Sequence, residues 1–142
     1  MFRLLPLLGL LALVFPTARA GDAAATSTTV TDVDAAGAAR LLAAHRQRGN
    51  LVILDIRTAG EFKEGRIDGS TNLDFYSNDF RQQVAKLERD KTYLVYCASG
   101  GRSLESLGLF RRLGFKTVFH LQDGIQGWLQ AEMHVTKVQL SE

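Results

Sequence analysis

The chain has 142 residues, of which 46% are hydrophobic and 23% are charged, values typical of one globular domain. They exclude a disordered chain, a collagen-like repeat and a protein that crosses a membrane many times. A formal net charge of +2 is too small for a protein that binds nucleic acid through bulk charge, and the single cysteine, Cys97, excludes an internal disulfide or a multi-cysteine zinc site.

The first 20 residues have the composition of a secretory signal peptide. Arg3 gives a positive start, residues 4–15 are almost entirely apolar, and Ala18-Arg19-Ala20 fits the small-x-small pattern cut by signal peptidase. The apolar run is shorter than the roughly 20 residues that a membrane-spanning helix needs. We therefore expect residues 1–20 to be cleaved and the protein to be exported without a membrane attachment. An uncleaved anchor or a buried first helix is the alternative.

The segments up to residue 75 predict a leader followed by alternating helices and strands. Residues 21–29 are rich in Ala, Thr and Ser and predict a flexible leader. A helix is expected at about 34–47, followed by a doubly buried strand at 51–56. Thr58, with an acidic residue three positions later, has capping-box spacing and predicts a brief helix. Residues 72–75 predict another strand.

The same alternation continues to the end of the chain. A helix is predicted at 79–88 and a strand at 93–96. From Leu104 to Leu113 an apolar residue recurs at every third position, which predicts an amphipathic helix. A last strand at 117–121 and a short helix at 125–131 follow. We therefore expect residues 30–142 to form one small α/β domain with a mainly parallel central sheet, flanked by helices on both faces.

The strongest sign of chemistry is the segment after the strand at 93–96. It consists of Cys97, Ala98, Ser99, Gly100, Gly101, Arg102 and Ser103. The carboxyl ends of parallel strands form the ligand crevice, and a loop of small residues opening a helix can point its N–H groups at an anion. Such donors, together with Arg102, should lower the pKa of the Cys97 thiol and favour the nucleophilic thiolate. The alternative is a buried core cysteine.

A second strand end carries Asp55 and Arg57. Arg57 lies either on the rim of the site, where it would attract anions, or in a pair with Asp55 that holds the following loop. Arg66 either adds positive charge at the entrance or is a solvated surface residue. No metal site is expected, and the histidines are too scattered for one to be placed near the cysteine loop: His45, His120 and His134.

Four segments of the chain form an ordered set of motifs. They are Asp55-x-Arg57 with Glu61-Phe62, the run from Gly65 to Asn72, the loop from Cys97 to Ser103, and Gly114-Phe115 with Asp123-Gly124 and Trp128. Each is weak alone, but in order and spacing they resemble the rhodanese-like domain family, and within it the single-domain exported sulfurtransferases of bacteria. The resemblance covers about residues 32–135.

The resemblance implies a thiosulfate sulfurtransferase of the bacterial periplasm that works as a monomer. Cys97 would take the outer sulfur of a small anionic donor such as thiosulfate and pass it from a persulfide to a thiol or cyanide acceptor, with no metal or organic cofactor. The backbone N–H groups of residues 98–103 would stabilise the anionic sulfur. Arg102 would hold the loop or bind the donor, and Ser99 and Ser103 would offer hydroxyl donors.

Two other functions stay open on the sequence. One is a non-catalytic rhodanese-like module that carries sulfur or binds a partner. The other is phosphatase or arsenate-reductase chemistry. Four residues separate Cys97 from Arg102, as in the family's sulfurtransferases, whereas the related dual-specificity phosphatases have five. This count favours sulfur transfer.

Overall fold

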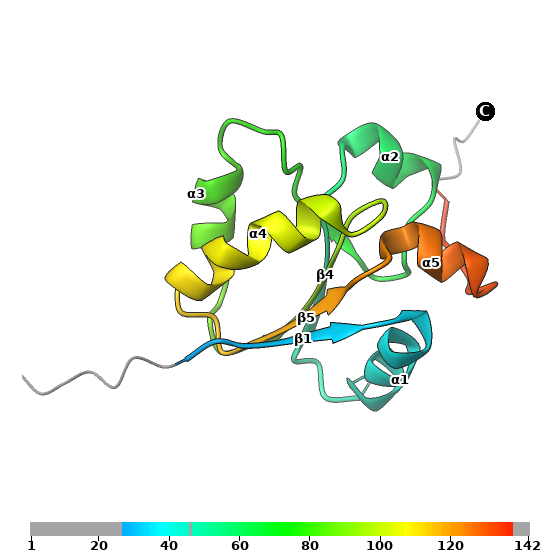
Figure 1. The fold of residues 1–142 in the computed structure, drawn as a ribbon, viewed down its shortest axis with the longest axis horizontal. Helices are drawn as coiled ribbons and strands as arrows, with labels where there is room; N and C mark the ends of the chain where they lie inside the picture. Colours follow the sequence, from blue (N-terminus) through cyan, green and yellow to red (C-terminus); the bar gives the residue numbers. More distant parts are fainter. Residues whose placement is uncertain (1–26, 46, 138–142) are drawn as a thin grey trace, which may run out of the picture.

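The computed structural model describes residues 27–45 and 47–137, and these residues form five strands and five helices (Figure 1). In chain order they are β1 (Thr29–Val33), α1 (Ala35–His45), β2 (Leu51–Asp55), α2 (Ala59–Glu64), β3 (Thr71–Asn72), α3 (Phe80–Ala85), β4 (Thr92–Tyr96), α4 (Gly101–Arg112), β5 (Thr117–Leu121) and α5 (Gly124–Gln130). The predicted signal peptide and most of the predicted leader lie outside the described residues. The last leader residue, Thr29, belongs to β1. Within the described part, no helix is long and apolar enough to cross a membrane.

The strands form one parallel sheet in the order β1-β5-β4-β2-β3. The α/β class and the parallel sheet predicted from the sequence are confirmed. Because all strands run the same way, their carboxyl ends meet at one edge, where parallel sheets gather ligand-binding residues. β4 lies between β5 and β2, with Tyr96 in register with Asp55. The residue after β4 is therefore central to this edge.

Apolar side chains pack on both faces of the sheet, because successive side chains of a strand point to opposite faces. Tyr93, Val95 and Cys97 join the core covered by α3 and α4. Leu94 and Tyr96 join the core covered by α1 and α5. Figure 1 shows these two pairs of helices on opposite sides of the sheet, which confirms the predicted three-layer arrangement.

Local capping signals place two of the helices where the sequence predicts them. Thr58 accepts a hydrogen bond from the Glu61 N–H, and the Glu61 carboxylate accepts one from the Thr58 N–H at 2.9 Å, which completes the capping box of α2. Asp34 precedes α1 and accepts from the N–H of Gly37 at 2.7 Å. These side chains satisfy N–H groups that the first helical turn leaves without partners.

Two of the predicted elements end three residues earlier than expected. β3 ends at Asn72 instead of residue 75, because the chain turns at Asp74, whose carboxylate accepts from the N–H of Tyr76 at 2.9 Å. α3 ends at Ala85 instead of residue 88, where the N–H groups of Lys86 and Leu87 bond to the carbonyls three residues earlier, both at 3.1 Å, and so tighten the last turn.

The apolar series from Leu104 to Leu113 does not lie on one face of α4. Leu104 is 60% exposed, while α4 buries Leu107, Leu109 and Phe110. The reason is geometric: at about 100° per residue, each step of three falls short of a full turn by about 60°, so a strict three-residue spacing drifts around the helix.

Candidate active site

Cys97 follows β4 directly, at the centre of the carboxyl edge of the sheet, and only 1% of its surface is exposed. The chain then curls through three residues into α4, which begins at Gly101. Figure 1 shows this loop between α2 and α5, at the edge where the strands end. Cys97 is a free thiol among the described residues. The fold therefore places the thiol in the crevice position that the sequence predicts.

Hydrogen bonds to α5 fix which way the peptide groups of the loop point. The carbonyls of Cys97 and Ala98 accept from the N–H groups of Ile125 and Gln126 at 2.9 and 3.0 Å. With these carbonyls turned toward α5, the Gly100 N–H points back at the Cys97 sulfur, 3.2 Å from Sγ. The loop thus presents a backbone donor to the thiol, as expected of an anion cradle.

Two glycines allow this close packing. Gly100 has φ of 97°, and a Cβ built on it would lie 1.8 Å from the carbonyl oxygen of Gln122. Gly124, the first residue of α5, has φ of 58°, and its Cβ would lie 2.4 Å from the Ala98 carbonyl oxygen. Both positions require the left-handed conformation and the absence of a side chain.

The surroundings of Cys97 favour its thiolate. Burial alone raises the pKa of the thiol, but hydrogen bonds from the Ser103 hydroxyl, whose Oγ lies 3.4 Å from Sγ, and from the backbone N–H groups of Ser103, Gly100 and Ser99 outweigh it. The pKa of Cys97 is therefore lowered from its ordinary value, in the direction predicted. Since the thiolate is the nucleophilic form, the loop activates the sulfur.

Arg102 pairs with a carboxylate of α2. Its Nη2 and Nη1 donate to Glu61 Oε1 and Oε2 at 2.8 and 3.0 Å. The bonded guanidinium lowers the pKa of Glu61 to about 2, and Glu61 in turn raises the pKa of Arg102. The guanidinium also lies 5.4 Å from the centre of the Tyr76 ring. Arg102 therefore ties the start of α4 to α2, and its contact with a donor stays a prediction.

Arg57 lies in a buried pair rather than on an exposed rim. Its Nη2 is 2.6 Å from Asp55 Oδ2 and 2.7 Å from the Gly65 carbonyl, and only 6% of the residue is exposed. This is the loop-holding alternative that the sequence left open; contact between Arg57 and substrate stays a prediction. Arg66 is half-buried, with its guanidinium 4.6 Å from the centre of the Phe62 ring, and is not a freely solvated side chain.

From the sequence, no histidine was expected near the cysteine loop, and this expectation was wrong. His120 Nε2 lies 2.9 Å from Ser103 Oγ, and His120 Nδ1 lies 2.9 Å from Asp32 Oδ1. Asp32 and His120 are 88 residues apart but sit opposite each other where β1 pairs with β5. Only the strand order brings them together, so no local spacing signal could have revealed them.

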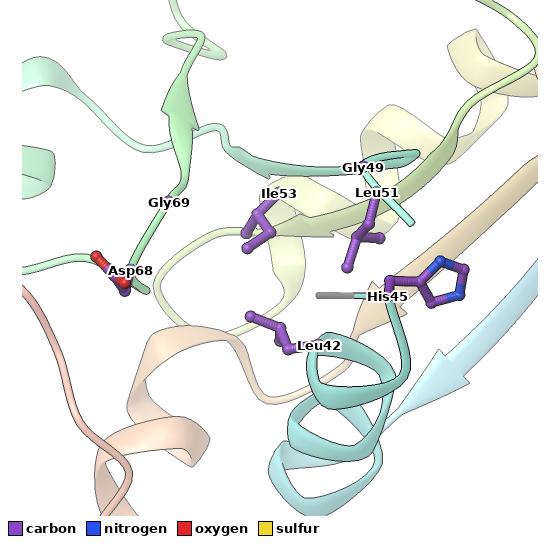
Figure 2. Close-up of a pocket in the computed structure, with 7 residues that line it drawn as sticks. All are labelled: Leu42, His45, Gly49, Leu51, Ile53, Asp68 and Gly69. Carbon is purple, nitrogen blue, oxygen red and sulfur yellow. The ribbon is translucent and has the colours of Figure 1, made fainter. Parts of the chain in front are cut away.

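Two of the cavities in the described part of the molecule differ in their relation to Cys97. One of about 310 Å³ lies beside the end of α1 (Figure 2). Its lining residues are Leu42, His45, Gly49, Leu51, Ile53, Asp68 and Gly69. None belongs to the cysteine loop or hydrogen-bonds to it, so this cavity is not the candidate site.

The other cavity, of about 360 Å³, lies between α2 and α5. No residue of the cysteine loop lines it, but two of its lining residues hydrogen-bond to the loop. Glu61, which holds Arg102, and Ile125, which binds the Cys97 carbonyl, both line it. Its charged lining residues are of both signs, Glu61 and Glu64 against Arg57 and Lys137. Within the described residues, no group of three or more His, Cys, Asp or Glu side chains could hold a metal ion.

A buried cysteine, cradled by backbone N–H groups between a central parallel strand and a helix, defines the class as an α/β protein with an activated cysteine loop. Residues 38–131 match the rhodanese-like domain family. The chain belongs to that family.

Similar proteins agree with this assignment. A rhodanese-related protein from Thermoplasma volcanium is 30% identical with a TM-score of 0.62, over 75% of this chain and 97% of the other. A protein named sulfurtransferase from Allochromatium vinosum is 28% identical, over 56% of this chain and 72% of its own. The probable adenylyltransferase/sulfurtransferase MoeZ of Mycobacterium tuberculosis is 35% identical over 55% of this chain, which spans only 20% of that protein.

Proposed function

We propose that the protein is a sulfurtransferase that carries sulfane sulfur as a persulfide on Cys97. The observation that supports this most directly is the buried sulfur itself, with the Gly100 N–H at 3.2 Å, the Ser103 hydroxyl at 3.4 Å and a lowered pKa. These donors suit a sulfur that is anionic both as a thiolate and as the outer atom of a persulfide. Relatives named sulfurtransferase support the same chemistry.

The reaction has two halves. In the first, the Cys97 thiolate attacks the outer sulfur of thiosulfate, the sulfur–sulfur bond of the donor breaks, and sulfite leaves with the electron pair. In the second, a thiolate or cyanide attacks the outer sulfur of the persulfide, and the Cys97 thiolate leaves. Each half exchanges one sulfur–sulfur bond for a new bond to the nucleophile, so no external oxidant, metal or organic cofactor is needed.

The remaining residues of the loop have supporting roles. The N–H groups of residues 98–103 stabilise the negative sulfur, and Arg102 keeps α4 in place through Glu61. The cavity between α2 and α5 is the proposed way in for donor and acceptor. Export, with removal of residues 1–20, and action as a monomer in a bacterial periplasm are part of the same proposal.

The test is to mix the reduced protein with thiosulfate alone and record its intact mass, then to add cyanide and follow thiocyanate. We expect a gain of one sulfur atom that disappears when cyanide is added. Since Cys97 is the only cysteine, Cys97→Ser should abolish both the gain and the turnover while leaving the fold unchanged by circular dichroism.

The outcomes separate the candidate functions. A gain with polysulfide but none with thiosulfate would keep the chemistry and change the donor. A gain that no acceptor removes would favour a sulfur carrier. A folded protein with a free thiol that gains sulfur from no donor would contradict the proposal and favour a partner-binding module.

A further inference from the structure

A chain of hydrogen bonds runs from Cys97 through three other elements of the fold. Cys97 Sγ lies 3.4 Å from Ser103 Oγ, Ser103 Oγ lies 2.9 Å from His120 Nε2, and His120 Nδ1 lies 2.9 Å from Asp32 Oδ1. The four side chains come from the end of β4, the first turn of α4, β5 and β1. Ser103 is fully buried and His120 is 3% exposed, so water does not compete for the contacts among Cys97, Ser103 and His120.

The hydrogen-bond directions in this chain depend on the charge of His120. With the ring neutral, the Asp32 carboxylate accepts from Nδ1–H, so Nε2 has a lone pair. The Ser103 hydroxyl, which donates to the Gly100 carbonyl at 3.0 Å, can turn its proton to this lone pair, and Ser103 Oγ can then accept from the Cys97 thiol. With the ring protonated, Nε2–H donates to Ser103 Oγ and to the Gly100 carbonyl at 3.3 Å, and the Ser103 hydroxyl turns its proton to the sulfur.

We propose that His120, oriented by Asp32, accepts the Cys97 thiol proton through Ser103. The proton on sulfur moves to Ser103 Oγ while the hydroxyl proton moves to His120 Nε2. The S–H and O–H bonds break, new O–H and N–H bonds form, and a thiolate and an imidazolium replace a thiol and an imidazole. Asp32 stabilises the imidazolium across the β1–β5 pair. Because His120 and Asp32 act on the sulfur only through Ser103, they are positioning residues.

The charged groups around this chain fit that assignment. β1 contributes the Asp32 carboxylate, β5 the imidazole and α4 the Ser103 hydroxyl. Arg102, on α4, acts on the charge of Cys97 from a distance, but Glu61 already holds its guanidinium. The Asp32 carboxylate is thus the anion in contact with His120, and its side chain is 59% exposed.

The inference rests on Cys97 being the nucleophile of the proposed function, but its test needs no sulfur donor. The rate of alkylation by iodoacetamide is measured against pH on the full chain, since this rate follows the thiolate fraction. Asp32→Asn keeps an acceptor oxygen for Nδ1–H and removes the charge. We expect the reactivity profile to move up by about one pH unit, which makes alkylation about tenfold slower on its rising limb.

Two matched controls should leave the profile unchanged. Asp90→Asn removes a 78% exposed carboxylate that pairs with Lys116. His45→Gln removes the imidazole at the end of α1, which hydrogen-bonds to the Asn50 side chain. A second readout is the imidazole nitrogen NMR signal of His120, which should report a change of protonation when Cys97 is alkylated. A residue with a purely structural role would not respond in this way.

Two results together would overturn the inference. One is an unchanged pH profile of the alkylation rate in a folded Asp32→Asn protein, and the other is a His120 nitrogen NMR signal that does not change when Cys97 is alkylated. Because the substituted carboxylate is mostly exposed, this variant is expected to fold even if replacing His120 itself does not. If the profile shifts but thiosulfate and other donors leave no sulfur on the protein, the relay stands and the proposed function fails, so the two are distinguishable.

Discussion

At the scale of single residues, the charge of Arg102 is directed at Glu61 rather than at the sulfur. The two hydrogen bonds between them join residues 41 positions apart and fasten α4 to α2. The Cys97 thiolate is favoured instead by the Ser103 hydroxyl and by backbone N–H groups. The N–H groups around the sulfur therefore depend on side chains that hold the loop and the start of α4 in place. Glu61, which bonds Arg102, is one of these side chains.

Replacing Glu61 with Gln should make the protein less stable in a pH-dependent way. The folded pKa of Glu61, about 2, lies below its ordinary value of 4.5 because of the hydrogen bonds with Arg102. A depressed carboxyl pKa stabilises the fold fully above the unfolded value, and this contribution is lost as the pH falls through the folded value. For a partly exposed pair we expect a loss of about 1–2 kcal/mol in the free energy of unfolding at pH 7.

Urea unfolding of Glu61→Gln and of the wild type at several pH values checks this prediction. The difference between them should shrink between pH 4.5 and pH 2. Glu64→Gln is the matched control, since Glu64 lies on the same short helix and is exposed. A difference that is the same at pH 2 and pH 7 would show that the Arg102 pair does not carry the effect.

The residues that the sequence could place are those close to Cys97 in the chain. Cys97, the small residues after it and Ser103 form a continuous segment whose composition carries the signal. Asp32 and His120 reach the same sulfur through strand pairing, and Glu61 was visible only as a capping residue and as part of a family motif. A long-range contact leaves no periodic or spacing signal in a single sequence.

At the scale of elements, the loop between β4 and α4 is held by the segment that leads from β5 into α5. α5 binds its carbonyls through the N–H groups of Ile125 and Gln126, and the left-handed Gly100 lets the chain pass against the Gln122 carbonyl. The position of the sulfur thus depends on how closely β4, α4 and α5 can approach each other. Neighbouring glycines of the loop offer a direct comparison.

Gly100→Ala should destabilise the protein and disorder the loop, whereas Gly101→Ala should not. A Cβ at position 100 would lie 1.8 Å from a backbone oxygen in a left-handed conformation, while at position 101 it would meet no atom within 4 Å. We expect the first change to lower the free energy of unfolding by about 2–4 kcal/mol. The second should alter it by less than about 1 kcal/mol, since alanine favours the helix.

Urea titrations of both variants, with the sulfur-transfer assay, test the comparison. Gly101→Ala is the control, because it adds the same methyl group one residue later. Equal stabilities for the two variants would mean that the loop does not pack against Gln122 as closely as the structure shows.

Elements were predicted best where one physical signal decides them. β2, β4 and β5 are apolar runs buried on both faces, and α2 begins at a complete capping box. β3 ends early at a turn where Asp74 bonds to a nearby backbone N–H, and α3 ends early in a tightened turn next to which Arg89 bonds to the Ala85 carbonyl. Such local contacts compete with the periodic pattern.

At the scale of the whole molecule, one sheet joins two apolar layers and carries the site at its edge. Leu94 and Val95 are consecutive residues of β4, and they belong to different layers. The strand order that puts β4 at the centre also puts β1 beside β5, so the same topology builds both the core and the contact between Asp32 and His120. The two layers should therefore unfold together.

Val95→Ala tests this coupling, because Val95 is fully buried in the layer under α3 and α4, whereas the only tryptophan, Trp128, lies in the layer under α1 and α5. The cavity left by two methyl groups should lower the free energy of unfolding by about 1–3 kcal/mol. If the sheet couples the layers, Trp128 fluorescence and far-UV circular dichroism should shift to the same lower urea midpoint.

Ala36→Ser, at an exposed position of α1, is the control and should leave both midpoints nearly unchanged. Separate midpoints for the two probes would show that each face of the sheet unfolds as an independent unit, and the cysteine loop would then owe its stability to the α3–α4 layer alone.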